Sequence, residues 1–172
     1  MPSRLFVAVW PPPDLAARLD ALPRPDEPGV RWEPAGLAHV TLRFLGDAVI
    51  EEVAAALGGV RLPSATAEVG PAVSRLGRSV LCVPVAGLDE LHDAVVRATA
   101  HLGEPPPGRR FAGHLTLARL RHRAACGLAG HRVSGSFEVT EVALVRSLLP
   151  GTPGAPPVGR TYETVARFAV GE

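Results

Sequence analysis

Two copies of one short pattern hold the residues best suited to chemistry. His39-Val40-Thr41-Leu42 and His114-Leu115-Thr116-Leu117 both read His-x-Thr-x with apolar x, and they lie nearly half the chain apart. An imidazole titrates near neutral pH, so it can give or take a proton in a reaction. A neighbouring hydroxyl can donate a hydrogen bond to a developing negative charge. Two such pairs could serve as acid and base around one reacting centre.

Both patterns lie in segments that alternate in hydrophobicity, 38–44 and 111–120, and this alternation predicts strands. Alternate side chains of a strand point to opposite faces. The apolar residues of each pattern can therefore be buried, while His39 and Thr41, and likewise His114 and Thr116, share the other face. If the two strands pack about a pseudo-twofold axis, the pairs face each other across a cleft. Two imidazoles on opposite sides of one phosphorus suit an in-line displacement, in which one activates water and the other protonates the leaving oxygen.

The histidines could instead have a structural role, and this interpretation is weaker for two matching motifs than for one histidine. A single histidine in an apolar strand is usually a structural or surface residue, but two matching copies in matching contexts favour a function. Zinc is poorly served by two histidines without a paired Asp, Glu or Cys. The sequence therefore predicts His39, Thr41, His114 and Thr116 as catalytic residues, with no metal and no cofactor.

Residues that follow the two patterns could contact a substrate. Arg43 shares the strand parity of His39, so it is expected to face the cleft. Arg119 has the opposite parity to His114 and would reach the site only if the strand bends or ends near Ala118. Phe44 has core parity, which favours packing over stacking on a base.

Composition limits the partners and the compartment. The formal net charge is +1, too small for coating long nucleic acid, so any RNA contact should be local. There is no lysine, which excludes a lysine-dependent phosphate loop. Cys82 and Cys126 form no CxxC pair, and no stretch has the length of a membrane span. We expect a cytoplasmic monomer that does not bind membranes.

The remaining patterns predict an α+β fold. No long linker divides residues 1–172, so we expect one domain. Apolar stripes and breakers predict helices over 14–22, 49–57 and 88–102. Other apolar or alternating runs predict strands over 4–10, 30–32, 65–76, 79–85, 137–148 and 161–170.

The two patterns and their flanks resemble the 2H phosphoesterase superfamily, most closely its RNA 2′,3′-cyclic phosphodiesterase family, also called 2′-5′ RNA ligase-like. The likeness covers the segments 4–9, 31–46, 111–119, 142–148 and 162–163. It implies a bilobal pseudo-twofold fold, with antiparallel sheets lining a central cleft, helices outside and one motif per lobe. It also implies hydrolysis of RNA 2′,3′-cyclic phosphate ends to 2′-phosphomonoesters.

The same resemblance implies roles for single residues. His39 would donate a proton to the 3′ oxygen, His114 would accept one from water, and Arg119 would contact substrate. The residues alone do not order the two histidines, because the motifs are nearly symmetric. The family usually has proline before its second histidine, whereas this chain has Gly113. Glycine allows a similarly tight geometry but adds freedom, which leaves the position of His114 less defined.

Other functions remain open at this point. The same chemistry could act on a cyclic phosphate of a small nucleotide or on a 2′-5′-linked oligonucleotide, because the catalytic pair reads phosphorus and not the base. A non-catalytic module that binds RNA ends is a third interpretation, although binding alone does not need two proton carriers. The reverse reaction, 2′-5′ RNA ligation, is expected to be weak.

Overall fold

A computed structural model describes residues 2–121, 124–155, 157 and 159–171. Within them the helices are α1 (Pro13–Asp20), α2 (Ile50–Gly58) and α3 (Asp89–Thr99). The strands are β1 (Ser3–Val9), β2 (Val30–Trp32), β3 (Val40–Ala48), β4 (Ala65–Val69), β5 (Ser74–Leu76), β6 (Val80–Ala86), β7 (His114–Leu120), β8 (Gly135–Val139), β9 (Glu141–Leu148) and β10 (Thr161–Ala169). The α+β class predicted from the sequence is confirmed. No helix in these ranges is long and apolar enough to cross a bilayer.

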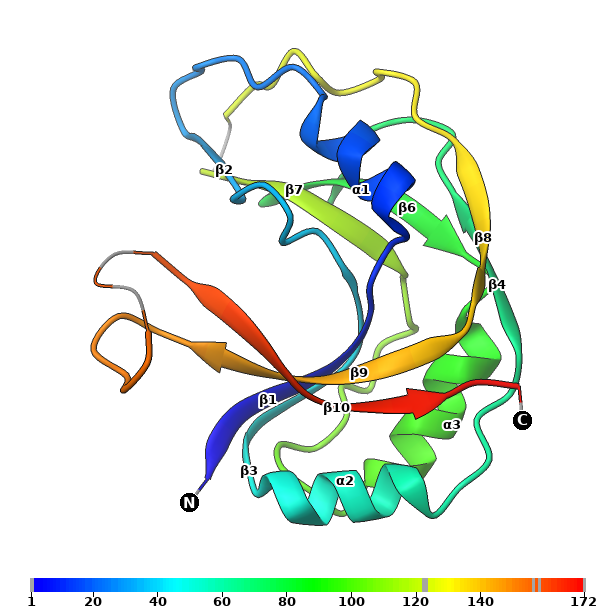
Figure 1. Ribbon diagram of the computed structural model, residues 1–172. Coiled ribbons are helices and arrows are strands. Elements are labelled where there is room, and N and C mark those ends of the chain that lie inside the picture. The colour runs from blue at the N-terminus through cyan, green and yellow to red at the C-terminus, as the bar shows by residue number, and fades with distance from the viewer. Residues whose placement is uncertain (1, 122–123, 156, 158, 172) are drawn as a thin grey trace.

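The strands form a curled antiparallel sheet with two arms (Figure 1). The first arm has the order β10-β9-β1-β3, and the second has β7-β6-β4-β8, with β2 beside β7 and β5 beside β6. The arms join where β3 pairs with β7, at the single register pair Val40 and Leu115. Since β1, β9 and β10 lie together, both ends of the chain belong to the first arm. The two motifs thus lie on the two strands that connect the arms.

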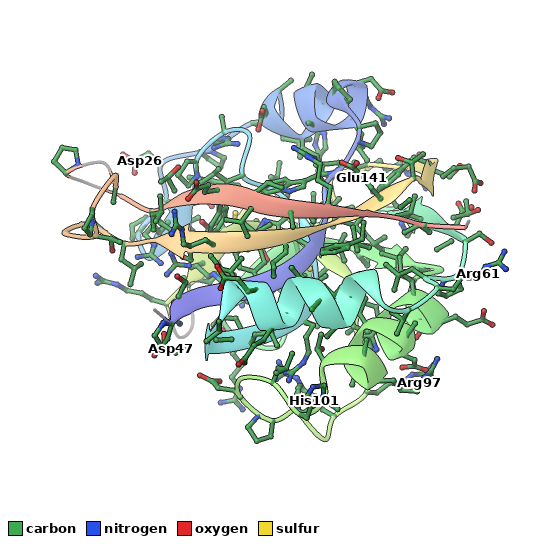
Figure 2. All side chains as sticks on the ribbon, turned by 60° about the horizontal axis from the view of Figure 1, so that its bottom comes forward. Asp26, Asp47, Arg61, Arg97, His101 and Glu141 are labelled. Carbon is green, nitrogen blue, oxygen red and sulfur yellow. The ribbon has the colours of Figure 1, made fainter. Side chains whose placement is uncertain are left out.

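Helices cover the outer faces of the arms. In Figure 1, α2 and α3 lie side by side next to the first arm, and α1 lies near the second arm. Each helix buries one apolar stripe, such as Leu15 and Leu19 of α1 and Leu91 and Val95 of α3. Charged side chains such as Arg61 and Arg97 are directed outward (Figure 2). The helices therefore leave the inner side of the curled sheet for the site.

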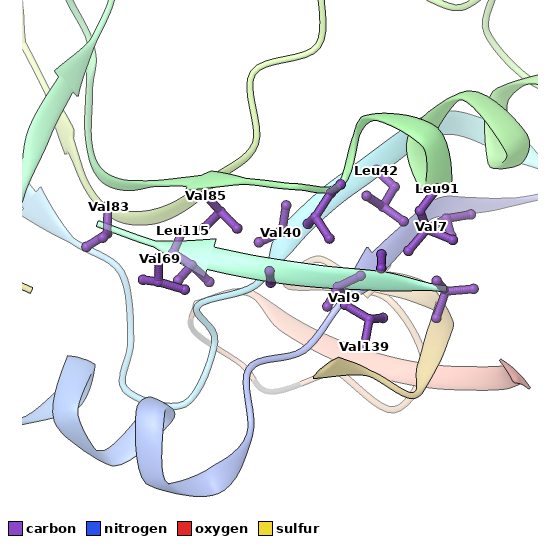
Figure 3. Packing of buried hydrophobic residues seen from close by; sticks show 14 of the residues in the cluster. Val7, Val9, Val40, Leu42, Val69, Val83, Val85, Leu91, Leu115 and Val139 are labelled. Atoms are coloured by element: carbon purple, nitrogen blue, oxygen red, sulfur yellow. The ribbon is translucent and has the colours of Figure 1, made fainter. Parts of the chain in front are cut away.

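The main core fixes the strands that carry the motifs (Figure 3). The four apolar motif residues are buried, as predicted: Val40, Leu42, Leu115 and Leu117. Leu115 is fully buried at the junction of the arms, and burial of such a side chain contributes about 1.5–3 kcal/mol. Packing of these residues directs their polar neighbours to the opposite face.

A β-bulge lies at the last residue of each motif. Val7 pairs with Arg43 and Ala8 with Thr41, so Leu42 is an extra residue in β3. Leu117 is extra in β7 in the same way, because Leu81 pairs with Ala118 and Cys82 with Thr116. An extra residue reverses the inward and outward alternation beyond it. The parity predicted for residues after the motifs is therefore inverted in both strands.

Several predicted boundaries are wrong because of local breaks. The strand predicted over 65–76 is two strands, β4 and β5, separated near Gly70-Pro71. The strand predicted over 137–148 is divided at Thr140 into β8, in the second arm, and β9, in the first. The chain thus passes from one arm to the other within a single apolar run, which hydrophobicity alone does not reveal.

Candidate active site

The two motifs meet at one cleft of about 260 Å³. His39 immediately precedes β3 and His114 begins β7, and both line this cleft together with Thr41 and Thr116. Counting outward from the Val40–Leu115 pair, antiparallel geometry sets Thr41 toward His114 and Thr116 toward His39. The predicted convergence of two His-Thr pairs is therefore confirmed.

Both imidazole rings are held by the backbone in the same way. Nδ1 of His39 lies 2.7 Å from the carbonyl oxygen of Leu37, and Nδ1 of His114 lies 2.7 Å from that of Ala112. A carbonyl oxygen can only accept, so each Nδ1 carries the hydrogen of this bond. In the neutral ring Nε2 then has a free lone pair, and in the charged ring it has a proton to donate. Each histidine is prepared for either half of acid–base catalysis.

Aromatic side chains enclose His39. Its ring stacks on Phe6 at a centroid distance of 4.9 Å, lies 5.1 Å from Trp10 and meets Tyr162 edge-on at 5.2 Å. This burial lowers the pKa of His39, because desolvation disfavours the charged ring. Weaker influences raise the pKa, namely the Leu37 carbonyl and the Glu33 carboxylate. Burial therefore favours the neutral form of His39.

The segment before His114 is tightly packed against β6. Gly113 accepts a hydrogen bond from the backbone N–H of Val85, at 2.8 Å. A Cβ on Gly113 would lie 2.5 Å from the carbonyl oxygen of Val85, closer than such atoms approach. Glycine is needed here because β6 leaves no room for a side chain. The freedom expected from glycine is therefore limited by this contact.

Arg119 reaches the cleft because of the bulge at Leu117. It lines the cleft, and its Nε lies 3.3 Å from a carboxylate oxygen of Glu33, which lines the cleft as well. The sequence analysis predicted that Arg119 would reach the site only if the strand bends or ends near Ala118, and the bulge at Leu117 provides this bend. Glu33 and Arg119 place a partly compensated cation near the histidines.

Several solved structures have the same architecture, and they match this chain over all or nearly all of its length. The chain is 27% identical to LigT of E. coli, crystallised with 3′-AMP, with a TM-score of 0.80 and 100% of both chains covered. A structure described as a phosphoesterase is 26% identical, with a TM-score of 0.80 and 100% of both chains covered. TT0787 of Thermus thermophilus is 28% identical, with a TM-score of 0.72, covering 98% of this chain and 99% of that one.

The chain matches the LigT-like 2H phosphoesterases in structure over its full length. No family model and no curated protein matches it by sequence. The likeness to LigT indicates a phosphodiesterase, and it agrees with the resemblance carried by the two motifs.

In this LigT-like chain, Arg43 does not reach the cleft, and the prediction that it faces the cleft is wrong. The bulge at Leu42 turns its side chain inward, where it is 2% exposed. Its guanidinium donates to the carbonyl oxygens of Phe44, Leu102 and Glu104 at 2.7, 3.1 and 2.6 Å. These hydrogen bonds connect the turn after α3 to β3, so Arg43 has a structural role and does not bind substrate.

Phe44 faces the cleft instead of the core, the reverse of the change seen at Arg43. It lines the cleft and is 39% exposed, so the expectation of core packing is wrong as well. Phe44 stands five residues after His39, as Arg119 stands five after His114. The two arms of this LigT-like fold thus present an aromatic ring and a guanidinium at matching positions.

Sequence reasoning missed the cleft residues that lie outside the motifs. Those are Arg4, Phe6, Glu33, Leu37, Ser147, Arg160 and Tyr162. Arg4 and Phe6 line the cleft from β1, but residues 5–9 of this strand are all buried and apolar, so hydrophobicity alone does not distinguish its two faces. The position of Arg4 and Phe6 in the cleft depends on the pairing of β1 with β3 and β9, and the sequence does not reveal this pairing.

No cluster of three or more metal-ligating side chains occurs among the residues described in the structure. The cleft of this LigT-like chain instead combines two backbone-tethered histidines, two threonine hydroxyls and arginine. These groups can move protons and stabilise an anion.

Proposed function

We propose that this LigT-like phosphoesterase hydrolyses RNA 2′,3′-cyclic phosphate ends to 2′-phosphomonoesters by two-histidine acid–base catalysis. One observation carries the proposal. His39 and His114 line a single cleft from two different arms, and each ring is tethered through Nδ1 so that Nε2 remains available. Binding of a phosphate needs hydrogen-bond donors, but it does not need two imidazoles with identical tethers.

The proposed reaction moves one proton in and one proton out. Nε2 of His114 takes a proton from water, and the water oxygen forms a bond to phosphorus. The bond between phosphorus and the 3′ oxygen breaks, and Nε2 of His39 gives its proton to that oxygen. The products are a 2′-phosphate and a free 3′ hydroxyl. This order of roles comes from the family resemblance, and each proton transfer is worth about 10²–10⁴-fold in rate.

The surroundings of His39 link its proton to substrate binding. Burial lowers the pKa of His39. An anionic cyclic phosphate beside the ring supplies the opposite charge that favours the imidazolium form. The donor would therefore acquire its proton as the substrate binds. Hydroxyls of Thr41 and Thr116, with Arg119, would stabilise negative charge on the non-bridging oxygens.

Phosphorus NMR of the products tests this function. An oligonucleotide ending in a 2′,3′-cyclic phosphate should yield only the 2′-phosphomonoester, in buffer that contains a chelator. His39→Ala and His114→Ala should each abolish most of the turnover. Full activity in either variant would remove the two-histidine mechanism. Tight binding of product without turnover of any cyclic phosphate would instead support a non-catalytic module that binds RNA ends.

A second candidate keeps the chemistry and changes the substrate to a small nucleotide. The observation in its favour is that E. coli LigT was crystallised with 3′-AMP, a mononucleotide. Turnover of cyclic mononucleotides, cyclic-phosphate oligonucleotides and 2′-5′-linked oligonucleotides, compared at equal concentration, separates the candidates. A kcat/KM that is highest on the mononucleotide would favour the small-nucleotide function.

A further inference from the structure

One end of the cleft carries positive charge that the two-histidine chemistry does not use. Arg4, Phe44, Ser147 and Arg160 line the cleft on the side of the first arm, and we call these four residues the rim site. Among the described residues, neither Arg4 nor Arg160 has an acidic partner within 4.0 Å. Arg119, in the second arm, is paired with Glu33. The uncompensated charge is therefore concentrated at the rim site.

The rim site also has an exposed aromatic ring. Phe44 is 39% exposed, and the guanidinium carbon of Arg4 lies 5.2 Å from the centroid of its ring. A cation over an aromatic face is a stable arrangement. Aromatic rings next to arginines are also the groups on which bases of single-stranded nucleic acids stack, while the arginines contact the backbone. The serine hydroxyl of Ser147 adds a hydrogen-bond donor beside them.

We propose that the rim site binds the second nucleotide of the RNA, counted from the cyclic phosphate. Phe44 stacks on the base of that nucleotide, and Arg4 and Arg160 contact the phosphodiester that joins it to the terminal nucleotide. This inference rests on the proposed function, since the cyclic phosphate must lie at His39 and His114. It assigns oligonucleotide ends, rather than free cyclic mononucleotides, as the preferred substrates.

The charge pattern gives the direction of the RNA. At the second arm, Glu33 would repel a further phosphate, although it also restrains Arg119. At the first arm, two arginines without acidic partners among the described residues attract one. The strand should therefore leave the cleft past Phe44. A substrate with one extra phosphodiester gains a contact there that a mononucleotide cannot make.

The test compares kcat/KM on a 2′,3′-cyclic mononucleotide with kcat/KM on a dinucleotide that ends in the same cyclic nucleotide. We expect the unaltered protein to favour the dinucleotide by roughly tenfold or more, the scale of one stacked base. The double variant R4Q/R160Q and the variant Phe44→Ala should each lose most of this preference, mainly through the dinucleotide. Arg61→Gln removes the same kind of charge from a residue outside the cleft lining (Figure 2) and should keep the preference.

Salt dependence provides a second readout. For single strands, the logarithm of the binding constant falls with the logarithm of salt concentration, by about 0.7 for each phosphate contact. The slope of kcat/KM should therefore be steeper for the dinucleotide than for the mononucleotide. The steeper slope should disappear in R4Q/R160Q and remain in Arg61→Gln.

Three results separate failure of this inference from failure of the proposed function. Equal kcat/KM on the two substrates, or equal losses on both in R4Q/R160Q, would overturn the rim site and leave the two-histidine hydrolysis intact. Absence of turnover on every cyclic phosphate would overturn the proposed function. The rim site is then decided by calorimetric binding of the 2′-phosphorylated dinucleotide and mononucleotide. Equal affinities would overturn it, and tighter dinucleotide binding that R4Q/R160Q abolishes would support it.

Discussion

The two histidines occupy matching positions in matching motifs, yet their environments differ. Each ring is held through Nδ1 by the carbonyl two residues earlier, at 2.7 Å in both cases. His39 packs among Phe6, Trp10 and Tyr162, whereas the segment of His114 lies against the backbone of β6. The motif therefore defines the geometry of each ring, and the flanking strands define its surroundings.

The difference arises from the strands next to each motif. In the first arm, β1 lies between β3 and β9, and Phe6 of β1 and Trp10, the residue after that strand, contact the ring of His39. In the second arm, β6 takes the corresponding place beside β7, where Gly113 meets the carbonyl of Val85. Two nearly identical tetrapeptides can thus place their imidazoles in different surroundings without any change in the motif itself.

Removal of either imidazole is the strongest way to test whether both halves are required. We expect His39→Ala and His114→Ala each to lower kcat by about 10²–10⁴-fold, because each variant loses one proton transfer. The double variant should lose far less than the product of the single effects, since groups that act as a unit are not additive. Single-turnover rates on a cyclic-phosphate substrate measure this. A normal rate in one single variant would show that only one half is catalytic.

Gly113 and Ala38 precede the two histidines and form a matched pair. Gly113→Ala should lower kcat by roughly 10- to 100-fold, because the new Cβ must displace the backbone that holds His114. The same variant should cost about 1–3 kcal/mol of unfolding free energy through overpacking.

Ala38→Gly is the control in the other half. It removes a partly buried methyl group without creating a clash, and kcat should change little. Denaturant unfolding and steady-state kinetics on both variants make the comparison. Unchanged kcat in Gly113→Ala would show that the approach of β6 does not determine the position of His114.

Sequence alone predicted the features that depend on local pattern. Alternation in each motif placed His39 and Thr41 on one face and buried Val40 and Leu42, as observed. The repeat of that pattern predicted that two halves share one cleft. These predictions succeeded because a short strand has only two faces, and burial of the apolar residues chooses between them.

The residues just beyond the motifs could not be predicted in this way. Arg43 and Phe44 exchanged their expected positions because Leu42 is an extra residue relative to β1. A bulge depends on how a strand pairs with its neighbour, so no feature of the single strand 38–44 indicates it. The aromatic residues around His39 were missed for a related reason, since Phe6 and Tyr162 come from opposite ends of the chain.

The effect of burial on His39 can be measured by NMR titration of its imidazole. We expect a pKa below the ordinary value of 6.5, and Tyr162→Ala should raise it by admitting water to the ring. Because the folded pKa is lowered, the unfolded chain binds the proton more readily. The stability that neutral His39 contributes is therefore lost as pH falls from 6.5 through the folded pKa.

Denaturant midpoints across this pH range, with His39→Gln as control, test the link to stability. The control should lack this part of the pH dependence because glutamine does not titrate. An unmoved pKa in Tyr162→Ala would contradict desolvation as the cause.

Charges at the second arm should have the smallest effects on the pKa of His39 and on stability, and the two pKa effects should have opposite signs. Glu33 raises the pKa of His39, and Arg119 lowers it. Glu33→Gln should therefore lower the pKa of His39, and Arg119→Gln should raise it. Each variant breaks an exposed ion pair at 3.3 Å, so the unfolding free energy should change by only about 0–1 kcal/mol.

The pair of variants distinguishes charge from packing at His39. Removal of either side chain loosens the same ion pair, so a packing effect would move the pKa of His39 in one direction in both variants. An electrostatic effect moves it in two directions, and added salt should reduce both shifts. NMR titration at low and high salt decides between them. Opposite shifts would show that the second arm influences the enclosed histidine of the first through charge, across the cleft that both arms line.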